Sequence, residues 1–189
     1  MWERKKGKKS GRGKYVPPDW SKAITDTAER LKHSDFFAKF ATQVEKGIKV
    51  ATGHVTDSGD GHEFGLVCLG LGSISNSRSS RHQLALLDCL IEHFANVELV
   101  TIYDPAFTEE DLAILRARYP SCDLTPFEQP RAKLLLYLPH VPIWLLDYTL
   151  RIQQSLLQQT VTISNNLQTL WEMVHDKNKK GDFQMSLVN

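Results

Sequence analysis

The sequence predicts a three-layer α/β fold, in which a mostly parallel sheet carries helices on both faces. Short and almost continuous apolar runs, the form of strands covered on both sides, alternate with segments whose apolar residues recur at helical spacing. The chain has 189 residues, enough for one domain of ordinary size, and 41% of them are hydrophobic, so a buried core can form. Together these observations favour a Rossmann-like domain.

The chain begins with a basic arm. Residues 1–14 hold seven lysines and arginines against one glutamate, so the arm carries +6, and because the whole chain is +1 the remaining residues sum to −5. Such a composition cannot bury enough apolar surface to fold, so residues 1–18 are expected to be disordered. The arm is either a nuclear-import signal, a weak nucleic-acid contact or only a solvated tail.

A helix is predicted next, from Trp20 to about Gly47, where the glycine provides a stop. Its apolar residues lie near one face and include Ile24, Leu31, Phe36, Phe37, Phe40 and Val44. A polar, glycine-rich loop over residues 51–61 follows. The metal-capable residues in and beside this loop are His54, Asp57, Asp60 and His62, but their spacing matches no standard site, so we predict no metal.

The strand and helix pattern then begins. Strands are predicted over residues 63–69, 97–103, 134–138 and 160–164, and helices over residues 77–94, 108–119, 142–159 and 167–175. Thr108 with Asp111 three residues later resembles a capping box, and Pro142 suits the first turn of a helix. Helical connections of this length imply right-handed crossovers and a parallel sheet.

The segment from Cys122 to Phe127 does not fit this alternation. It has the length of a short strand, but only a short connection, which includes Glu128–Arg131, separates it from the strand at 134. A parallel crossover needs a dozen residues or more. The segment is therefore either a loop or a frayed edge strand.

Composition also argues against several classes of protein. No apolar run approaches the length that spans a bilayer, and the first residues lack the hydrophobic core of a secretory signal, so we predict no membrane contact. Cys68, Cys89 and Cys122 are an odd number at wide spacings, which is typical of intracellular proteins and predicts neither a disulfide framework nor zinc. Cys68 and Cys89 lie in apolar segments and are expected to be inert core thiols.

Ligands of open parallel sheets bind beyond the carboxyl ends of the strands. The candidate ligand-binding residues lie there or in the helix that follows: Gly70, Gly72, Ser73, Ser75, Arg81, Asp104, His140 and Asn165. Glycines permit close approach of a ligand, helix amides attract an anion, and Asp104 stands where an acid could bind ribose hydroxyls. The match to GxGxxG is partial, because Ser75 replaces the third glycine and Asp104 follows Gly72 by 32 residues instead of about 20. A nucleotide-like ligand site and a purely structural turn both remain open.

Catalytic residues cannot be assigned from the sequence. His140 could act as an acid or base, but no nucleophile or paired carboxylate is placed beside it, so a structural histidine is the alternative. Arg78 and Arg81 open the helix after the glycine turn, where positive charge opposes the helix dipole. Either an anionic ligand or partner compensates them, or a nearby carboxylate forms a salt bridge.

Five motifs in this order resemble the "sensitivity to red light reduced" (SRR-like) family. They are CLGLGSIS at 68–75, RHQLA at 81–85, YDPAF at 103–107, YLPH at 137–140 and ISNN at 163–166. The resemblance extends over about residues 63–167. The chain departs from the family pattern between Cys122 and Leu134, where it looks shorter, and at Ser164, where the family has glycine.

The resemblance implies a regulatory protein of the cytoplasm and nucleus, associated with circadian-clock input and with control of haem biosynthesis. It carries over no catalytic residues and no cofactor. The leading hypothesis is a regulator whose cleft takes a small nucleotide-like ligand or a protein partner. The alternatives are an enzyme, such as an S-adenosylmethionine-dependent methyltransferase, and a scaffold that uses only its surface and its arm. Haem ligation by His140 or Cys68 is open, although no CxxCH or Cys-Pro motif supports it.

Four regions are expected along the chain. They are the disordered basic arm at 1–18, a helix and polar loop at 19–62, the SRR-like α/β domain at 63–180 and a tail at 181–189.

Overall fold

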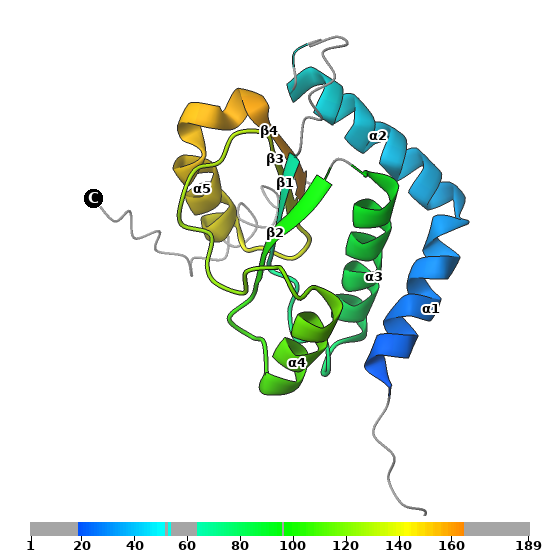
Figure 1. Ribbon diagram of the computed structural model, residues 1–189. Helices are drawn as coiled ribbons and strands as arrows, with labels where there is room; N and C mark the ends of the chain where they lie inside the picture. Colours follow the sequence, from blue (N-terminus) through cyan, green and yellow to red (C-terminus); the bar gives the residue numbers. More distant parts are fainter. Residues whose placement is uncertain (1–18, 52, 54–63, 96, 165–189) are drawn as a thin grey trace, which may run out of the picture.

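The computed structural model describes residues 19–51, 53, 64–95 and 97–164 (Figure 1). Several predictions lie outside these residues: the basic arm, the loop with its histidines and aspartates, Asn165, the helix at 167–175 and the tail.

A parallel sheet forms the centre of the molecule. Its strands are β1 (Phe64–Leu69), β2 (Val97–Tyr103), β3 (Leu134–Leu138) and β4 (Thr160–Ser164), in the spatial order β2-β1-β3-β4. Every neighbouring pair is parallel, so the carboxyl ends of all four strands lie at one edge. The four predicted strands and the α/β fold class are confirmed.

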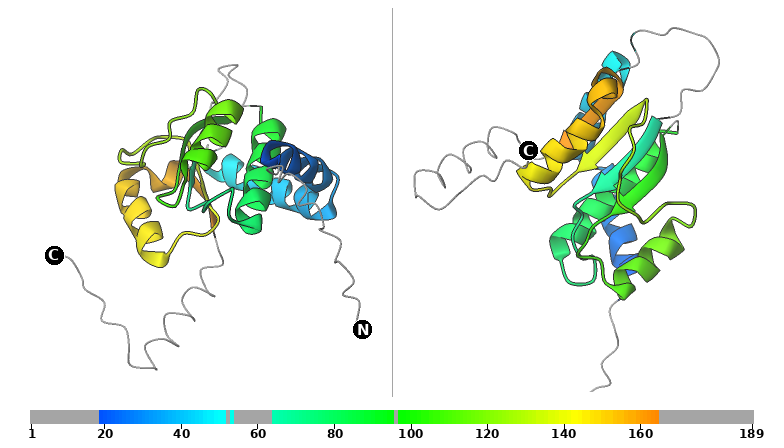
Figure 2. Two further views of the ribbon diagram at one scale, coloured as in Figure 1. Left: turned by 90° about the horizontal axis from the view of Figure 1, so that it is seen from below. Right: turned by 90° about the vertical axis from the view of Figure 1, so that its left-hand side faces the viewer.

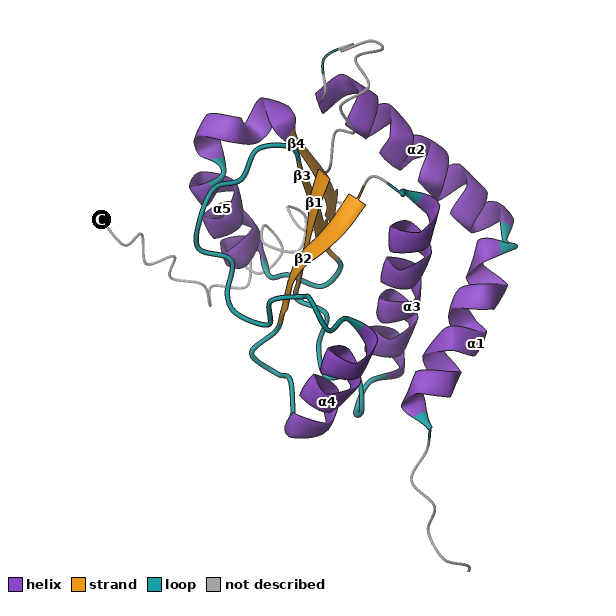
Figure 3. Ribbon diagram, in the orientation of Figure 1, coloured by secondary structure: helices purple, strands orange, loops and turns teal. Residues whose placement is uncertain are grey.

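Helices cover both faces of this sheet. They are α1 (Trp20–Lys32), α2 (Asp35–Ala51), α3 (Arg78–His93), α4 (Glu109–Arg118) and α5 (Ile143–Ile152), followed by a 3-10 helix, η1 (Gln154–Gln159). Figures 1 and 3 show α1, α2 and α3 on one side of the sheet and α5 on the other, and the left view of Figure 2 shows the same layers from below. The α4 helix follows the carboxyl end of β2 and begins with the predicted capping box of Thr108 and Asp111.

Two apolar layers hold the helices to the sheet. Alternate residues of β1 point to opposite faces: Leu66 and Cys68 belong to the layer under α1, α2 and α3, whereas Val67 and Leu69 belong to the layer under α5. All six residues of β1 are buried, which is why its sequence reads as a continuous apolar run.

The single helix predicted from Trp20 to Gly47 is wrong, because the chain forms two helices that meet at His33 and Ser34. The Ser34 hydroxyl accepts the backbone N–H of Phe37 at 3.1 Å, the contact of an N-cap, and this starts α2. Gly47 does not end α2. A Cβ at Gly47 would lie 3.0 Å from Cγ1 of Val161, so the glycine lets α2 pack closely on β4.

The helix predicted over 142–159 is also divided. Regular α-helix ends at Ile152, and η1 continues to Gln159. Gln153, between the two, is fully buried. Its side-chain oxygen accepts the N–H of Arg131 at 2.9 Å, and its amide donates to the Thr160 hydroxyl at 3.1 Å, so this junction anchors the loop before β3.

The segment from Cys122 to Phe127 is a loop with one bridging residue. Asp123 pairs with Thr101 at the outer side of β2, where the N–H of Ile102 donates to the Asp123 carbonyl and Asp123 donates to that of Val100, both at 2.9 Å. The chain then crosses to β3, on the other side of β1.

The cysteines behave as core thiols where they are buried. Cys68 and Cys89 are buried and Cys122 is half-buried. Burial raises the pKa of the Cys68 thiol well above its ordinary value and raises that of Cys89 to about 11. No helix in the described ranges combines the length and the apolar character needed to cross a membrane.

Candidate functional site

The glycine turn after β1 is shaped by the protein's own packing. Gly70 and Gly72 have φ angles of 74° and 75°, in the left-handed region that favours glycine. A Cβ on Gly70 would lie 2.6 Å from Cγ1 of Val141, and a Cβ on Gly72 would lie 2.8 Å from the hydroxyl of Ser80. The β3–α5 connection therefore occupies the space next to Gly70 that close approach of a ligand would use.

Asp104, at the end of β2, is directed at this turn. One carboxylate oxygen accepts the N–H of Gly72 and the other accepts the N–H of Ala106, each at 2.7 Å. The N–H of Gly70 also donates to the Tyr103 carbonyl at 3.3 Å. Asp104 thus joins the loops that follow β1 and β2, and its use in binding ribose stays a prediction.

A second carboxylate supports the turn from α4. Asp111 is fully buried, and its oxygens accept the N–H of Ser75 at 2.7 Å and that of Thr108 at 2.9 Å. Burial opposes ionisation of this carboxyl, but these backbone bonds, with further bonds from the hydroxyls of Ser73 and Ser75, hold its pKa below the ordinary value. The sequence indicated only the capping role of Asp111.

Arg81 holds the turn from the other side. Its guanidinium donates to the carbonyl oxygens of Ile74 at 2.7 Å and Ser75 at 3.2 Å, and it lies 4.0 Å from the ring centroid of Trp20. Neither Arg78 nor Arg81 forms a salt bridge with any described carboxylate, so of the two alternatives the salt bridge has no partner within the described residues.

His140 has a partner that sequence analysis missed. The hydroxyl of Ser79, in the first turn of α3, lies 3.1 Å from Nε2 of His140, and both residues are exposed. They are 61 positions apart in the sequence, so no local spacing could reveal the contact. A serine next to a histidine is the contact of a nucleophile and its base, but no carboxylate among the described residues bonds to His140 to orient it.

A pocket of about 250 Å³ opens on the α5 side of the same edge. We call it the aromatic pocket; its lining consists of Leu69, Gly70, Tyr103, Pro105, Pro126, Phe127, Trp144, Leu145, Tyr148 and Thr149. Two of its aromatic side chains are unusually exposed for their size, Trp144 at 67% and Tyr148 at 52%. The Thr149 hydroxyl donates to the Leu145 carbonyl at 2.7 Å, so its proton is engaged within the helix.

Only Gly70 of this lining was a predicted site residue. A signal was present in α5, where Trp144 and Tyr148 stand four residues apart and lie on the outer side, while Leu146 and Thr149 are buried. Next to the two aromatic residues on the exposed side lies the ion pair of Asp147 and Arg151, so the apolar part of this surface is limited to the aromatic side chains.

The described residues offer no ready metal site, because no three histidines, cysteines or carboxylates among them are grouped to hold an ion. Of the two side chains considered for haem, Cys68 is fully buried in the core, while His140 is exposed at the edge.

Comparison with known proteins gives a family. A model of the SRR1 domain matches residues 44–188, well over half of the chain, and covers the motifs that suggested the SRR-like resemblance. No curated protein and no solved structure shows a significant match to the chain.

Proposed function

Since the chain belongs to the SRR1 domain family, we propose that it is a regulatory protein that acts in circadian-clock input and in control of haem biosynthesis, in the cytoplasm and the nucleus. The family resemblance supports these roles. We further propose that regulation works through a small, flat, apolar ligand bound in the aromatic pocket.

The aromatic pocket is the observation that carries the proposed mechanism. It lies at the carboxyl ends of β1 and β2, where ligands of open parallel sheets bind. Large exposed aromatic side chains leave apolar surface in water, and covering Trp144 and Tyr148 with a flat ring would remove it. A pocket of about 250 Å³ suits a ligand of one or two rings, or the edge of a larger ring system such as a tetrapyrrole.

The nucleotide-cofactor alternative has less support at the glycine turn. Val141 packs against Gly70, and both oxygens of Asp104 already accept backbone N–H groups. A nucleotide there would have to displace these contacts.

Thermal shift assays on the full chain distinguish an apolar ligand in the aromatic pocket from a nucleotide cofactor at the glycine turn. Protoporphyrin IX, a flat macrocycle whose apolar edge could enter the aromatic pocket while its two propionates stay in solvent, is the first probe. S-adenosylmethionine, S-adenosylhomocysteine, NAD and NADP serve as cofactor probes. We expect the melting temperature to rise with protoporphyrin IX in the wild type and in Phe36→Ser, a control at an aromatic residue that is 57% exposed on α2. The shift should be lost in Trp144→Ser. A shift with a cofactor probe that disappears in Asp104→Ala would instead place nucleotide binding at the glycine turn and favour the enzyme alternative.

The biological role is tested in cells that lack their SRR-like protein. Wild-type chain should restore the circadian period and the transcript level of the first enzyme of haem biosynthesis, and Trp144→Ser should not. Restoration of both by Trp144→Ser would separate the biological role from the aromatic pocket.

A further inference from the structure

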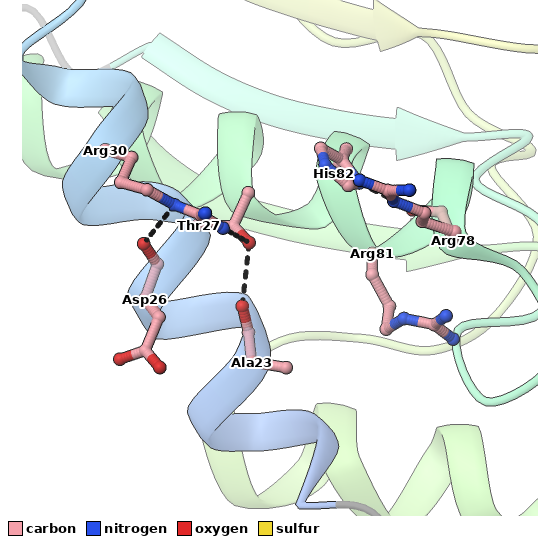
Figure 4. Close-up of a pocket in the computed structure, with 7 residues that line it drawn as sticks. All are labelled: Ala23, Asp26, Thr27, Arg30, Arg78, Arg81 and His82. Atoms are coloured by element: carbon pink, nitrogen blue, oxygen red, sulfur yellow. Dashed lines mark hydrogen bonds between the residues drawn. The ribbon is translucent and has the colours of Figure 1, made fainter.

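A second hollow, of about 330 Å³, lies between α1 and α3 on the other side of the sheet. We call it the arginine pocket; it is lined by Ala23, Asp26, Thr27, Arg30, Arg78, Arg81 and His82 (Figure 4). We propose that it binds the phosphate groups of a small phosphorylated molecule. This inference does not rest on the function proposed for the aromatic pocket.

The charge of the arginine pocket is positive and uncompensated. Three arginines line it, Arg30, Arg78 and Arg81, against the single aspartate Asp26. That carboxylate is engaged by Lys22, whose Nζ lies 2.6 Å from it. Among the described residues no carboxylate forms an ion pair with any of the three arginines, although residues 15–189 together carry −5.

Two of the arginines are held in place while keeping free donors. Arg30 donates from Nε to the Asp26 carbonyl and from one terminal nitrogen to the Thr27 hydroxyl, both at 3.2 Å. Arg81 uses one terminal nitrogen for its carbonyl partners and stacks on Trp20. A guanidinium has five N–H groups, so each retains donors for an anion, and their fixed positions reduce the entropy lost on binding.

Arg78 is the third member, and its side chain donates no hydrogen bond to any described residue. It is exposed at the start of α3, next to His82, whose ring lies 2.8 Å from the Arg78 carbonyl oxygen. Positive side chains in the first turn of a helix oppose its dipole. A bound phosphate would relieve this repulsion among the arginines and with the helix, and guanidinium forks match phosphate oxygens.

The two walls of the arginine pocket fall on different sides of the boundary of the family match. Its α1 wall, which supplies Asp26 and Arg30, precedes residue 44, where the match to the SRR1 domain begins. The α3 wall lies within the match. The site therefore combines a helix within the matched region with one that precedes it.

Isothermal titration of the full chain with pyrophosphate, at constant ionic strength set by sodium chloride, tests this site. We expect saturable binding to the wild type. Arg78→Gln and Arg30→Gln should each weaken it roughly fivefold, as expected for loss of one partly screened charge contact. Arg116→Gln, at an exposed arginine in the last turn of α4, is the matched control and should bind as the wild type does.

Deletion of residues 1–14 separates this site from the basic arm. The proposal predicts that the deletion variant keeps most of the pyrophosphate affinity. If the deletion abolishes binding while Arg78→Gln retains it, the arm binds the anion and the proposal is overturned. Equal affinity for sulfate and pyrophosphate, or no saturable binding by the wild type, would overturn it as well. Thermal melts of each variant establish that it is folded.

Discussion

The glycine turn and the aromatic pocket lie at the same edge of the sheet. They differ in how far the protein's own hydrogen bonds and packing contacts occupy their side chains and backbone groups. At the turn, Asp104 and Asp111 accept backbone N–H bonds, and Val141 fills the space beside Gly70. At the aromatic pocket, Trp144 and Tyr148 remain largely in solvent. The turn that looks most like a ligand site in the sequence is thus occupied by contacts within the protein, whereas the exposed aromatic side chains of α5 lie outside the five motifs.

The largest expected effect is on the glycine turn. Gly70→Ala places a Cβ 2.6 Å from Val141 and forces alanine to a φ of 74°, so we expect the free energy of unfolding to fall by about 3 kcal/mol. Gly53→Ala is the control, because its φ is 54° but nothing lies within 4 Å, and should cost only about 1 kcal/mol. Urea unfolding measures both. Equal losses would show that packing against Val141 contributes nothing.

Removing the second carboxylate of the turn should have the next largest effect. In Asp111→Asn one side-chain oxygen is replaced by an NH₂ group that cannot accept a backbone bond, so we expect a loss of about 2 kcal/mol at neutral pH. Circular dichroism in urea measures it. A loss below about 0.5 kcal/mol would mean that solvent replaces these bonds.

The pH dependence gives a separate test of Asp111. Its folded-state pKa is below the ordinary value of 3.8, so the stability it supplies is present above that value and is lost as the pH falls through the lower folded pKa. Between neutral pH and about 3, the unfolding free energy should fall more steeply in the wild type than in Asp111→Asn. Parallel pH profiles would contradict this assignment.

A substitution in the aromatic pocket should leave the free energy of unfolding almost unchanged and remove ligand binding, in contrast to the substitutions at the glycine turn. Trp144 is 67% exposed, so Trp144→Ser should change the unfolding free energy by less than about 0.5 kcal/mol while removing the response to protoporphyrin IX. Thermal melts with and without the probe report both quantities. A large intrinsic loss would make Trp144 a core residue and would remove the contrast with the glycine turn.

The smallest effect is expected at the serine and histidine pair. Ser79 and His140 are exposed, so Ser79→Ala, His140→Ala and the double variant should each stay within about 0.5 kcal/mol of the wild type. Hydrolysis of p-nitrophenyl acetate by the wild type that is lost in both single variants would instead assign the pair a catalytic role.

The fold was predictable because buried parallel strands are recognisable in the sequence as short, continuous apolar runs. All six residues of β1 and all five of β3 are buried, and both segments are apolar throughout. The division between α1 and α2 was not predictable from periodicity, because the apolar positions continue across it and one hydroxyl, that of Ser34, starts the second helix. Gly47 was wrongly predicted to end the helix, because its role is to allow close contact with Val161.

The positions of the candidate ligand-binding residues were predictable only where these residues follow the ends of strands. Gly70, Gly72, Asp104 and His140 lie at the carboxyl edge as expected from the parallel order. The aromatic pocket was not predicted because loops and strands distant in sequence meet there: Phe127 comes from the connection that crosses from β2 to β3, and Trp144 comes from α5. Such a meeting depends on the path of the chain and leaves no local spacing.

Native mass spectrometry of the chain purified under non-denaturing conditions tests the central claim most directly. The account predicts a small apolar molecule bound to the wild type and to Phe36→Ser, and absent from Trp144→Ser. A wild-type chain that carries no such molecule, or a Trp144→Ser chain that retains it, would contradict the claim that the aromatic pocket is the ligand site.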